Sequence, residues 1–207
     1  MRASDVAGAV GTARPGMPDA RLLHLCIAGL IVLFTAATLL AMGREPWCTC
    51  GTIRLWYGNV HGPENSQQIA DWYTPSHVIH GFLFYGALSL LGRITGRPLA
   101  LTLRFALAIG IEAAWEIAEN TPAVIAHYRA ATMAAGYTGD SLLNSMSDIA
   151  AMTAGFWLAS RLPAVATLAL ALAMEIGVAY AVRDNLTLNV LMLLQDFPAI
   201  RAWQAAA

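Results

Sequence analysis

Eight polar residues in this sequence recur at spacings that place them on single faces of three separate helices. Residues three, four or seven positions apart lie on the same face of an α-helix. Three such helices would present imidazole and carboxylate groups to one another if they packed side by side. The three sets are His77 and His80, then Glu112, Glu116 and Glu119, then Asp140, Asn144 and Asp148.

Imidazoles and carboxylates from neighbouring helices are the ligands of carboxylate-rich metal sites in helical bundles. These residues therefore predict a site for a divalent metal ion, zinc or another, whose chemistry would be the activation of water for hydrolysis. The spacing differs from the Glu-x-x-His repeat of di-iron bundles, so it selects no particular metal. The predicted metal ligands are His77, His80, Glu116 and Asp148, and the candidate catalytic residues are Glu112 as general base, Asp140 and Asn144.

The same residues are also compatible with a polar network that has no catalytic role. Buried polar groups in membrane bundles commonly form hydrogen bonds between helices. In that interpretation Asp140, after Gly139, caps the helix that follows it, and Asp148 pairs with His80 or with an arginine. Both interpretations remain open from the sequence alone.

The composition indicates a membrane protein. Apolar residues make up 57% of the 207 residues and charged residues only 12%, whereas soluble domains carry about 25% charged residues. The net charge is −1 and no basic cluster is present, which argues against binding to nucleic acid. The length suits one helical domain.

Hydropathy divides the chain into a tail at 1–20, which we expect to be flexible, and one transmembrane domain at 21–207. A span needs about 20 mostly apolar residues, and about five stretches approach that length. Shorter interfacial helices are expected at 122–136 and after 183. The fold class is thus predicted to be an all-α, multi-pass bundle, with spans at 22–42, 75–92, 99–120, 141–160 and 163–182.

Successive spans alternate in direction, so the polar ends of all five spans are expected at one membrane face. With the N-terminus inside, the inside segments hold six arginines and the outside segments five. This small bias favours the N-terminus inside and places the loop 43–75, together with the polar ends, outside.

Charged side chains within these spans need partners. A charge at the bilayer centre costs about 2.5–3.5 kcal/mol on insertion scales. Glu112, Glu116, Asp148 and Glu175 are therefore expected to face one another, a cation or water. Glu119 is at a helix C-terminus, where the helix dipole disfavours a carboxylate, and it is expected to have a positive partner.

The three cysteines do not form a disulfide framework or a zinc-ribbon pattern. Cys26 lies within the first apolar stretch and is expected to be buried. Cys48 and Cys50 belong to a Cys-Thr-Cys-Gly turn, for which a structural role is favoured over a redox role.

Several longer runs resemble a family of bacterial inner-membrane proteins known as domain of unknown function 2585. The resemblance covers about residues 25–204 and implies a multi-pass inner-membrane protein, whose outer face is periplasmic, but no reaction. The runs are CTCG, ENSQ, DWYTPSHVIHGFLFYG, EAAWEIAEN, YTGDSLLNSMSD and RDNLTLN.

The sequence is also similar, at the level of pattern alone, to VanZ-like membrane proteins. In those proteins a histidine near one helix start, a glutamate in the next helix and an Asp-containing helix with small residues recur. The corresponding residues here would be His77 or His80, Glu112 or Glu116, and Asp148 with Gly155.

Three functions remain as hypotheses. The first is a metal-dependent hydrolase acting on a lipid-linked or membrane-surface substrate. The second is a small transporter, which the absence of a visible inverted repeat disfavours. The third is a structural or assembly protein that binds another membrane protein. The lipid bilayer is an expected partner in each case.

Overall fold

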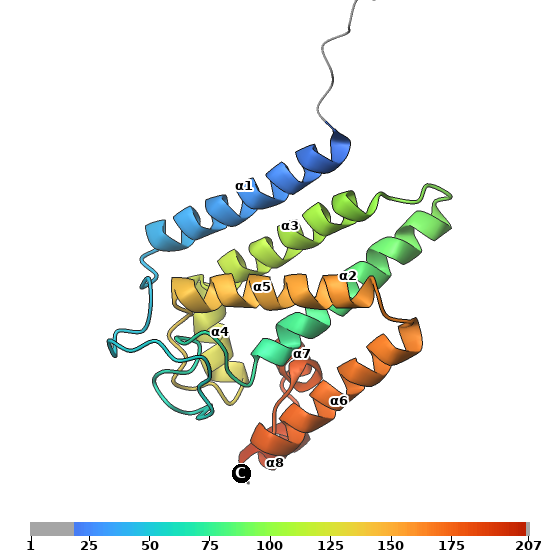
Figure 1. Ribbon diagram of the computed structural model, residues 1–207. Helices are drawn as coiled ribbons and strands as arrows, with labels where there is room; N and C mark the ends of the chain where they lie inside the picture. The colour runs from blue at the N-terminus through green and yellow to red at the C-terminus, as the bar shows by residue number, and fades with distance from the viewer. Residues whose placement is uncertain (1–18, 206–207) are drawn as a thin grey trace, which may run out of the picture.

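The computed structural model describes residues 19–205, and all regular elements in that range are α-helices (Figure 1). The predicted all-α class is confirmed for this part of the chain, while the predicted tail lies almost wholly outside it. The long helices are α1 (Ala20–Ala41), α2 (Thr74–Ile94), α3 (Leu101–Glu119), α5 (Leu142–Ala159) and α6 (Ala164–Val182). The short ones are α4 (Pro122–Ala131), α7 (Leu186–Leu194) and α8 (Pro198–Ala205).

Local sequence signals explain where several helices begin and end. The Thr121 hydroxyl accepts a hydrogen bond from the Val124 amide, and Pro122 occupies the first turn of α4, where its missing N–H is not needed. Ser141 caps α5 by accepting from the Asn144 amide. Asp140 therefore does not cap this helix, in contrast to the expectation from the Gly139-Asp140 pair. Arg183 ends α6 in the left-handed conformation, with φ of 54°.

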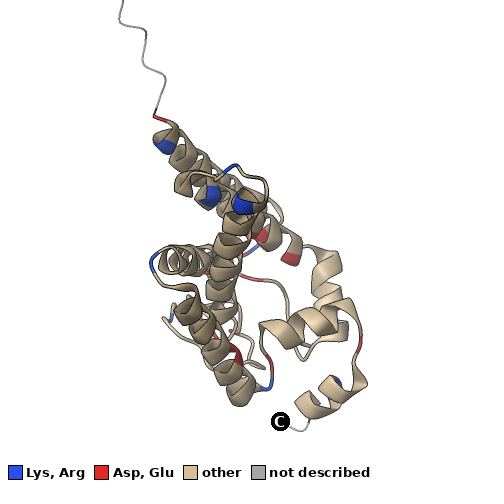
Figure 2. Ribbon diagram, turned by 90° about the vertical axis from the view of Figure 1, so that its right-hand side faces the viewer, with Lys and Arg blue, Asp and Glu red and all other residues tan. Residues whose placement is uncertain are grey.

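Three helices, rather than five, are long and apolar enough to cross a membrane within residues 19–205. They are α1, α2 and α6. Helix α3 carries several carboxylates and Arg104, and α5 carries Asn144 and Asp148. Figure 2 shows long stretches of helix without charged residues, and the arginines mostly at helix ends and in loops. The polar residues that define the candidate site thus lower the apolar character of the two central helices.

The closest helix packing brings α2 against α5, and α1 packs against α3. Gly81 of α2 faces the backbone at Met152, and Gly155 of α5 faces the backbone at Val78. A side chain at either glycine would overlap a carbonyl oxygen of the opposite helix, so the two backbones approach as only glycine allows. Adjacent to this contact lies an apolar core that includes Ile149, Met152 and Phe156.

The polar ends of the long helices gather at one end of the bundle, together with α4 and the loop between α1 and α2 (Figure 1). This loop is joined to the start of α5 by backbone hydrogen bonds. The amide of Leu142 donates to the carbonyl of Glu45 at 2.8 Å, and the amide of Ser141 donates to the carbonyl of Ser66 at 3.0 Å. The arrangement agrees with the alternation of direction inferred from the sequence.

Glu175 of α6 contributes to the fold rather than to the polar cluster. Its two carboxylate oxygens accept hydrogen bonds from the amides of Leu186 and Thr187, at 3.1 and 3.0 Å. The amides at a helix N-terminus lack partners within the helix and favour a negative charge. The Glu175 carboxylate therefore has its partners at the start of α7. The lengths of the spans do not predict this contact.

We expect Glu175→Ala to loosen α7 and to cost about 1 kcal/mol of stability, the usual effect of losing a helix cap. Hydrogen exchange of the Leu186 and Thr187 amides should become faster, while exchange in α5 stays unchanged. Glu45→Ala is the matched control, because Glu45 is exposed. Equal exchange at α7 in both variants would contradict the assignment.

Candidate metal centre

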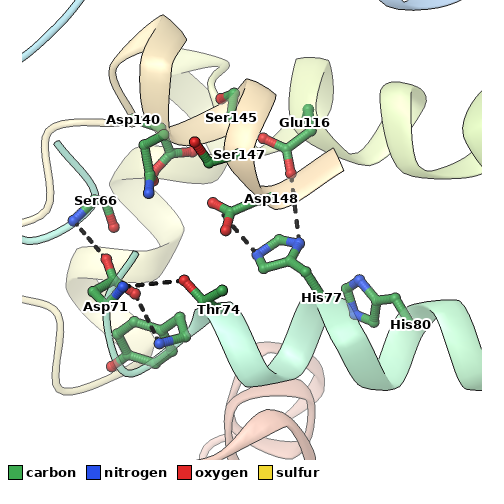
Figure 3. A network of polar contacts seen from close by, with 12 residues as sticks. Ser66, Asp71, Thr74, His77, His80, Glu116, Asp140, Ser145, Ser147 and Asp148 are labelled. Carbon is green, nitrogen blue, oxygen red and sulfur yellow. Dashed lines mark hydrogen bonds and ion pairs between the residues drawn. The ribbon is translucent and has the colours of Figure 1, made fainter. Parts of the chain in front are cut away.

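The three predicted polar stripes meet at one place, between α2, α3 and α5 (Figure 3). His77 lies at the centre. Its Nδ1 is 2.7 Å from a carboxylate oxygen of Glu112 and 3.6 Å from one of Glu116, and its Nε2 is 3.8 Å from Asp148. One imidazole thus faces carboxylates from two other helices.

Two overlapping groups of side chains could each hold a metal ion. His77, Glu116 and Asp148 offer ligand atoms within 4.8 Å of one another, and all three residues are buried. His77, His80 and Glu112 form the other group. His80 lies nearly one turn further into the bundle than His77 on α2, and Glu112 lies one turn further than Glu116 on α3. His80 therefore meets Glu112. The structure therefore pairs His80 with Glu112 rather than with Glu116 and Asp148.

Glu112 is held by both histidines. Nδ1 of His77 lies 2.7 Å from Oε1 of Glu112, and Nδ1 of His80 lies 3.1 Å from Oε2. The Glu112 side chain is fully buried. A carboxylate bound to two imidazoles fixes their orientation, as partners of metal-binding histidines do. The contacts are those of a positioning residue, and the role of general base predicted from the sequence stays a prediction.

Glu116 and Asp148 have buried oxygen atoms without hydrogen-bond partners. These are both carboxylate oxygens of Glu116 and Oδ1 of Asp148. Within residues 19–205, the only basic side chains that pair with Glu112, Glu116 or Asp148 are those of the two histidines. Burying an ionised carboxylate without a partner costs several kcal/mol. A cation between Glu116, Asp148 and His77 would supply the missing partner.

Asp140 and Asn144 line a cavity next to this cluster, and both also bind protein groups. The Asp140 carboxylate accepts hydrogen bonds from the Asn120 amide at 2.9 Å and from the Tyr137 hydroxyl at 3.0 Å. Burial raises the pKa of Asp140 to about 6, although these two hydrogen bonds act in the opposite direction. Asn144 donates to the carbonyl of Gln68 at 3.0 Å.

Asp71 fixes the loop that covers this end of the bundle. Its carboxylate accepts from the amides of Ser66 and Tyr73, at 2.9 and 2.8 Å (Figure 3). Ser66 adopts a positive φ of 60°, which lets the loop fold over the site. Burial raises the pKa of Asp71 in spite of these hydrogen bonds. Asp71 thus joins the wall of the cavity from the loop side.

A cavity of about 350 Å³ opens beside the cluster. Polar side chains line it together with apolar side chains from α2, α3 and α7. Glu119 also lines the cavity. Within the described residues no basic side chain pairs with Glu119, so the positive partner expected from the sequence is not seen. The apolar lining residues include Phe84, Ile111, Trp115, Leu186, Val190 and Leu193, and the polar ones include Asp71, His77, His80, Glu112, Asp140, Asn144 and Asp148.

Sequence reasoning missed a second buried polar group, around Asp184. Its carboxylate accepts from the Tyr73 hydroxyl at 3.1 Å and from the Gln204 amide at 3.2 Å. These bonds join α8 to the start of α2, next to the cavity. Asp184 follows the predicted span 163–182, whose end is expected at the polar face, but no spacing pattern connects it with Gln204, which is 20 residues away.

The cysteines differ in part from expectation. Cys26 is exposed on α1 instead of buried. Cys48 and Cys50 are joined by a disulfide. Their sulfur atoms lie near the Glu64 carboxylate, but thiolates rather than disulfide sulfurs are good metal ligands.

Fold and site together define an all-helical protein with membrane-capable helices and a buried histidine–carboxylate cluster. The chain belongs to the family described as "Protein of unknown function (DUF2585)", whose model matches residues 39–206. The predicted family resemblance is confirmed.

Relatives named UPF0314 protein match most of the chain. The one from Sphingopyxis alaskensis is 52% identical over 86% of this chain and 93% of its own length. The one from Rhizobium meliloti is 58% identical over 79% of this chain and 81% of its own length, and the one from Paracoccus denitrificans is 51% identical over 86% and 90%. No solved structure matches the chain.

Proposed function

We propose that this protein is a multi-pass inner-membrane hydrolase that depends on a divalent cation held by His77, Glu116 and Asp148. The observation that carries the proposal is the set of buried, unpartnered oxygen atoms of Glu116 and Asp148 around one imidazole. A purely structural polar network has no reason to leave three carboxylate oxygens without donors.

The proposal includes α3 and α5 as membrane-crossing helices, which gives five crossings. Charged and polar side chains in membrane-crossing helices face the bundle interior, and Glu112, Glu116 and Asp148 are all buried in it. The outward faces of the neighbouring helices are strongly apolar, as at Phe34 in α1 and Ile176 in α6, each 68% exposed. With the N-terminus inside, the cluster lies near the periplasmic face.

The proposed division of labour follows the contacts. His77, Glu116 and Asp148 would hold the divalent cation, which would lower the pKa of a bound water molecule toward neutrality. Glu112 holds the imidazoles of His77 and His80 in position. Asp140, with a pKa of about 6, takes up and returns the proton, because catalytic acids and bases work best near the ambient pH.

The proposed substrate is lipid-linked or lies at the membrane surface, and carries an ester or phosphoester bond. The cavity supports this substrate class because both polar and apolar side chains line it. Its apolar lining residues include Ile111 and Val190, which are 46% and 43% exposed and continue onto the outer surface of the bundle. A lipid chain can therefore lie against these apolar side chains while the scissile bond lies at the polar ones.

The test is hydrolysis of lipid esters and lipid phosphoesters by purified protein in vesicles, with metal content measured in parallel. We expect activity with a bound divalent cation and none after chelation. Asp140→Asn should retain the cation but lose activity by roughly 100-fold or more, the usual contribution of a proton-transferring group. A protein that binds the cation and hydrolyses none of these lipids would contradict the enzymatic part.

The acidity of Asp140 gives this reaction a pH dependence. A base must be deprotonated, so hydrolysis by wild-type protein should rise as the pH increases through about 6. Below that pH the Asp140 carboxyl is protonated and the rate falls. A flat profile between pH 5 and 7, with metal content constant, would exclude Asp140 as the base.

A further inference from the structure

The Cys48–Cys50 disulfide lies in the loop between α1 and α2, at the end of the bundle where the polar residues gather. The two residues differ in access. Cys48 is only 3% exposed, whereas Cys50 is exposed to solvent. An incoming thiol can therefore reach the sulfur of Cys50 but not that of Cys48.

The disulfide contributes little to holding the fold together. A crosslink stabilises mainly by shortening the unfolded chain, and the effect grows with the length of the closed loop. This bond links residues two positions apart, so the closed loop is close to the shortest possible. The loop is held instead by hydrogen bonds such as those from the Tyr57 amide to Ala70 and from the Ile69 amide to Arg54.

Both sulfur atoms receive hydrogen bonds from nearby donors. The Cys50 amide donates to Sγ of Cys48 at 3.2 Å, and the Gln68 side-chain amide donates to Sγ of Cys50 at 3.5 Å. The Thr52 hydroxyl lies 3.3 Å from Sγ of Cys50 and must be the donor, because a disulfide sulfur carries no proton. Such donors stabilise a thiolate, the species that leaves in thiol–disulfide exchange.

The negative charge of Glu64, which lies near the disulfide, is offset by partners within the loop. The Glu64 carboxylate accepts from the Gln68 side chain at 2.8 Å and pairs with Arg54 at 3.5 Å. These contacts orient the Gln68 amide, which is 1% exposed, toward the disulfide. They also offset the charge that would otherwise disfavour a thiolate at Cys50.

We propose that Cys48–Cys50 is a thiol–disulfide exchange site whose reaction partner is a dithiol. A thiolate of the dithiol attacks Sγ of Cys50, the S–S bond breaks, and Cys48 leaves as a thiolate that takes up a proton. The second thiolate of the dithiol then attacks the dithiol's other sulfur, which is bound to Cys50, and Cys50 leaves as a thiolate. Two electrons pass from the dithiol, now a disulfide, to the cysteine pair, and the reverse reaction reoxidises the pair.

The experiment uses the full chain in vesicles with Cys26→Ser, so that the pair supplies all the thiols. Dithiothreitol and reduced glutathione serve as the dithiol and monothiol probes, and free thiols are counted by mass after maleimide labelling. Because the Cys48 thiolate stays next to the mixed disulfide, it should expel glutathione. We therefore expect dithiothreitol to reduce the disulfide completely. Reduced glutathione should need a thiol concentration at least tenfold higher for the same effect.

Two further readouts separate exchange from simple reduction. Acid quenching during the glutathione reaction should trap glutathione on Cys50 and not on Cys48. Thr52→Val should slow the second step, the release of Cys50 from the mixed disulfide, severalfold without changing the unfolding temperature, whereas Thr38→Val, in α1, should leave the rate unchanged. Resistance to dithiothreitol until the protein unfolds, or adducts equally divided between the two cysteines, would overturn the proposal.

Discussion

Chelation of divalent cations is expected to lower the unfolding temperature of the wild-type protein, and Glu116→Gln is expected to abolish this difference. A ligand that binds only the folded state stabilises it by about 2.7 kcal/mol at a concentration 100 times its dissociation constant. For a chain of this size the shift is roughly 5–10 °C. The measurement is thermal unfolding in detergent, with zinc or with a chelator.

The same variant separates a cation site from a structural network in the chelated state. Without a cation, Glu116 is a buried carboxylate whose two oxygens lack hydrogen-bond partners, with Nδ1 of His77 3.6 Å from one of them. Replacing it with the neutral, similarly shaped glutamine should therefore raise the unfolding temperature of chelated protein. Exposed Glu45→Gln is the control and should behave as wild type. A wild-type protein unaffected by zinc, manganese or magnesium would contradict the cation site.

The second large effect concerns the helix contact that holds the cluster together. We expect Gly81→Ala to destabilise the protein by roughly 3 kcal/mol or more, because forcing atoms into a packed contact costs about 1–3 kcal/mol even without a backbone clash. A Cβ there would overlap the Met152 carbonyl oxygen and the Phe156 amide nitrogen. Separating α2 from α5 would also move His77 away from Asp148, so cation binding should fall with stability.

Gly86→Ala provides the matched control on the same helix. A Cβ at Gly86 meets no atom within 4 Å, and alanine favours a helix over glycine by about 1 kcal/mol. This variant should therefore be as stable as wild type or slightly more stable, with unchanged cation binding. Unfolding and metal titration of both variants test the contact. Equal stability of the two variants would show that α2 and α5 are not packed this closely.

Much of the fold could be predicted from the sequence because the helices carry local signals. The apolar stretches and turn residues place each long helix within a few residues of its observed bounds. Thr121 and Pro122 mark the end of one helix and the start of the next. The number of membrane-capable helices was less predictable, because Glu112, Glu116 and Asp148 make two central helices too polar to be recognised by composition.

That these polar residues lie together was predictable from the sequence, but their pairing was not. Helical spacing and span direction brought His77, Glu116 and Asp148 to one place, as the structure does. Spacing along single helices does not give the relative depth of two helices, so the pairing of His80 with Glu112 was missed. The close approach at Gly81 sets that depth, and a glycine within an apolar helix gives no indication of it.

Long-range partners of the remaining polar residues were not accessible from the sequence either. Glu175 binds amides of α7, and Asp184 binds a side chain of α8. Both contacts depend on how the chain folds back after α6. Polar residues of this kind can be recognised as needing a partner, while the identity of the partner requires the tertiary structure.

The most direct test of the cation site is X-ray absorption spectroscopy of zinc-loaded protein, with the wild type compared with Glu116→Gln and Asp148→Asn. The proposed site predicts about one zinc per chain, bound to an imidazole nitrogen and carboxylate oxygens at about 2.0–2.2 Å. Each variant should lose most of the bound zinc. Wild-type protein that retains no zinc, or zinc whose ligands are unchanged in both variants, would contradict it.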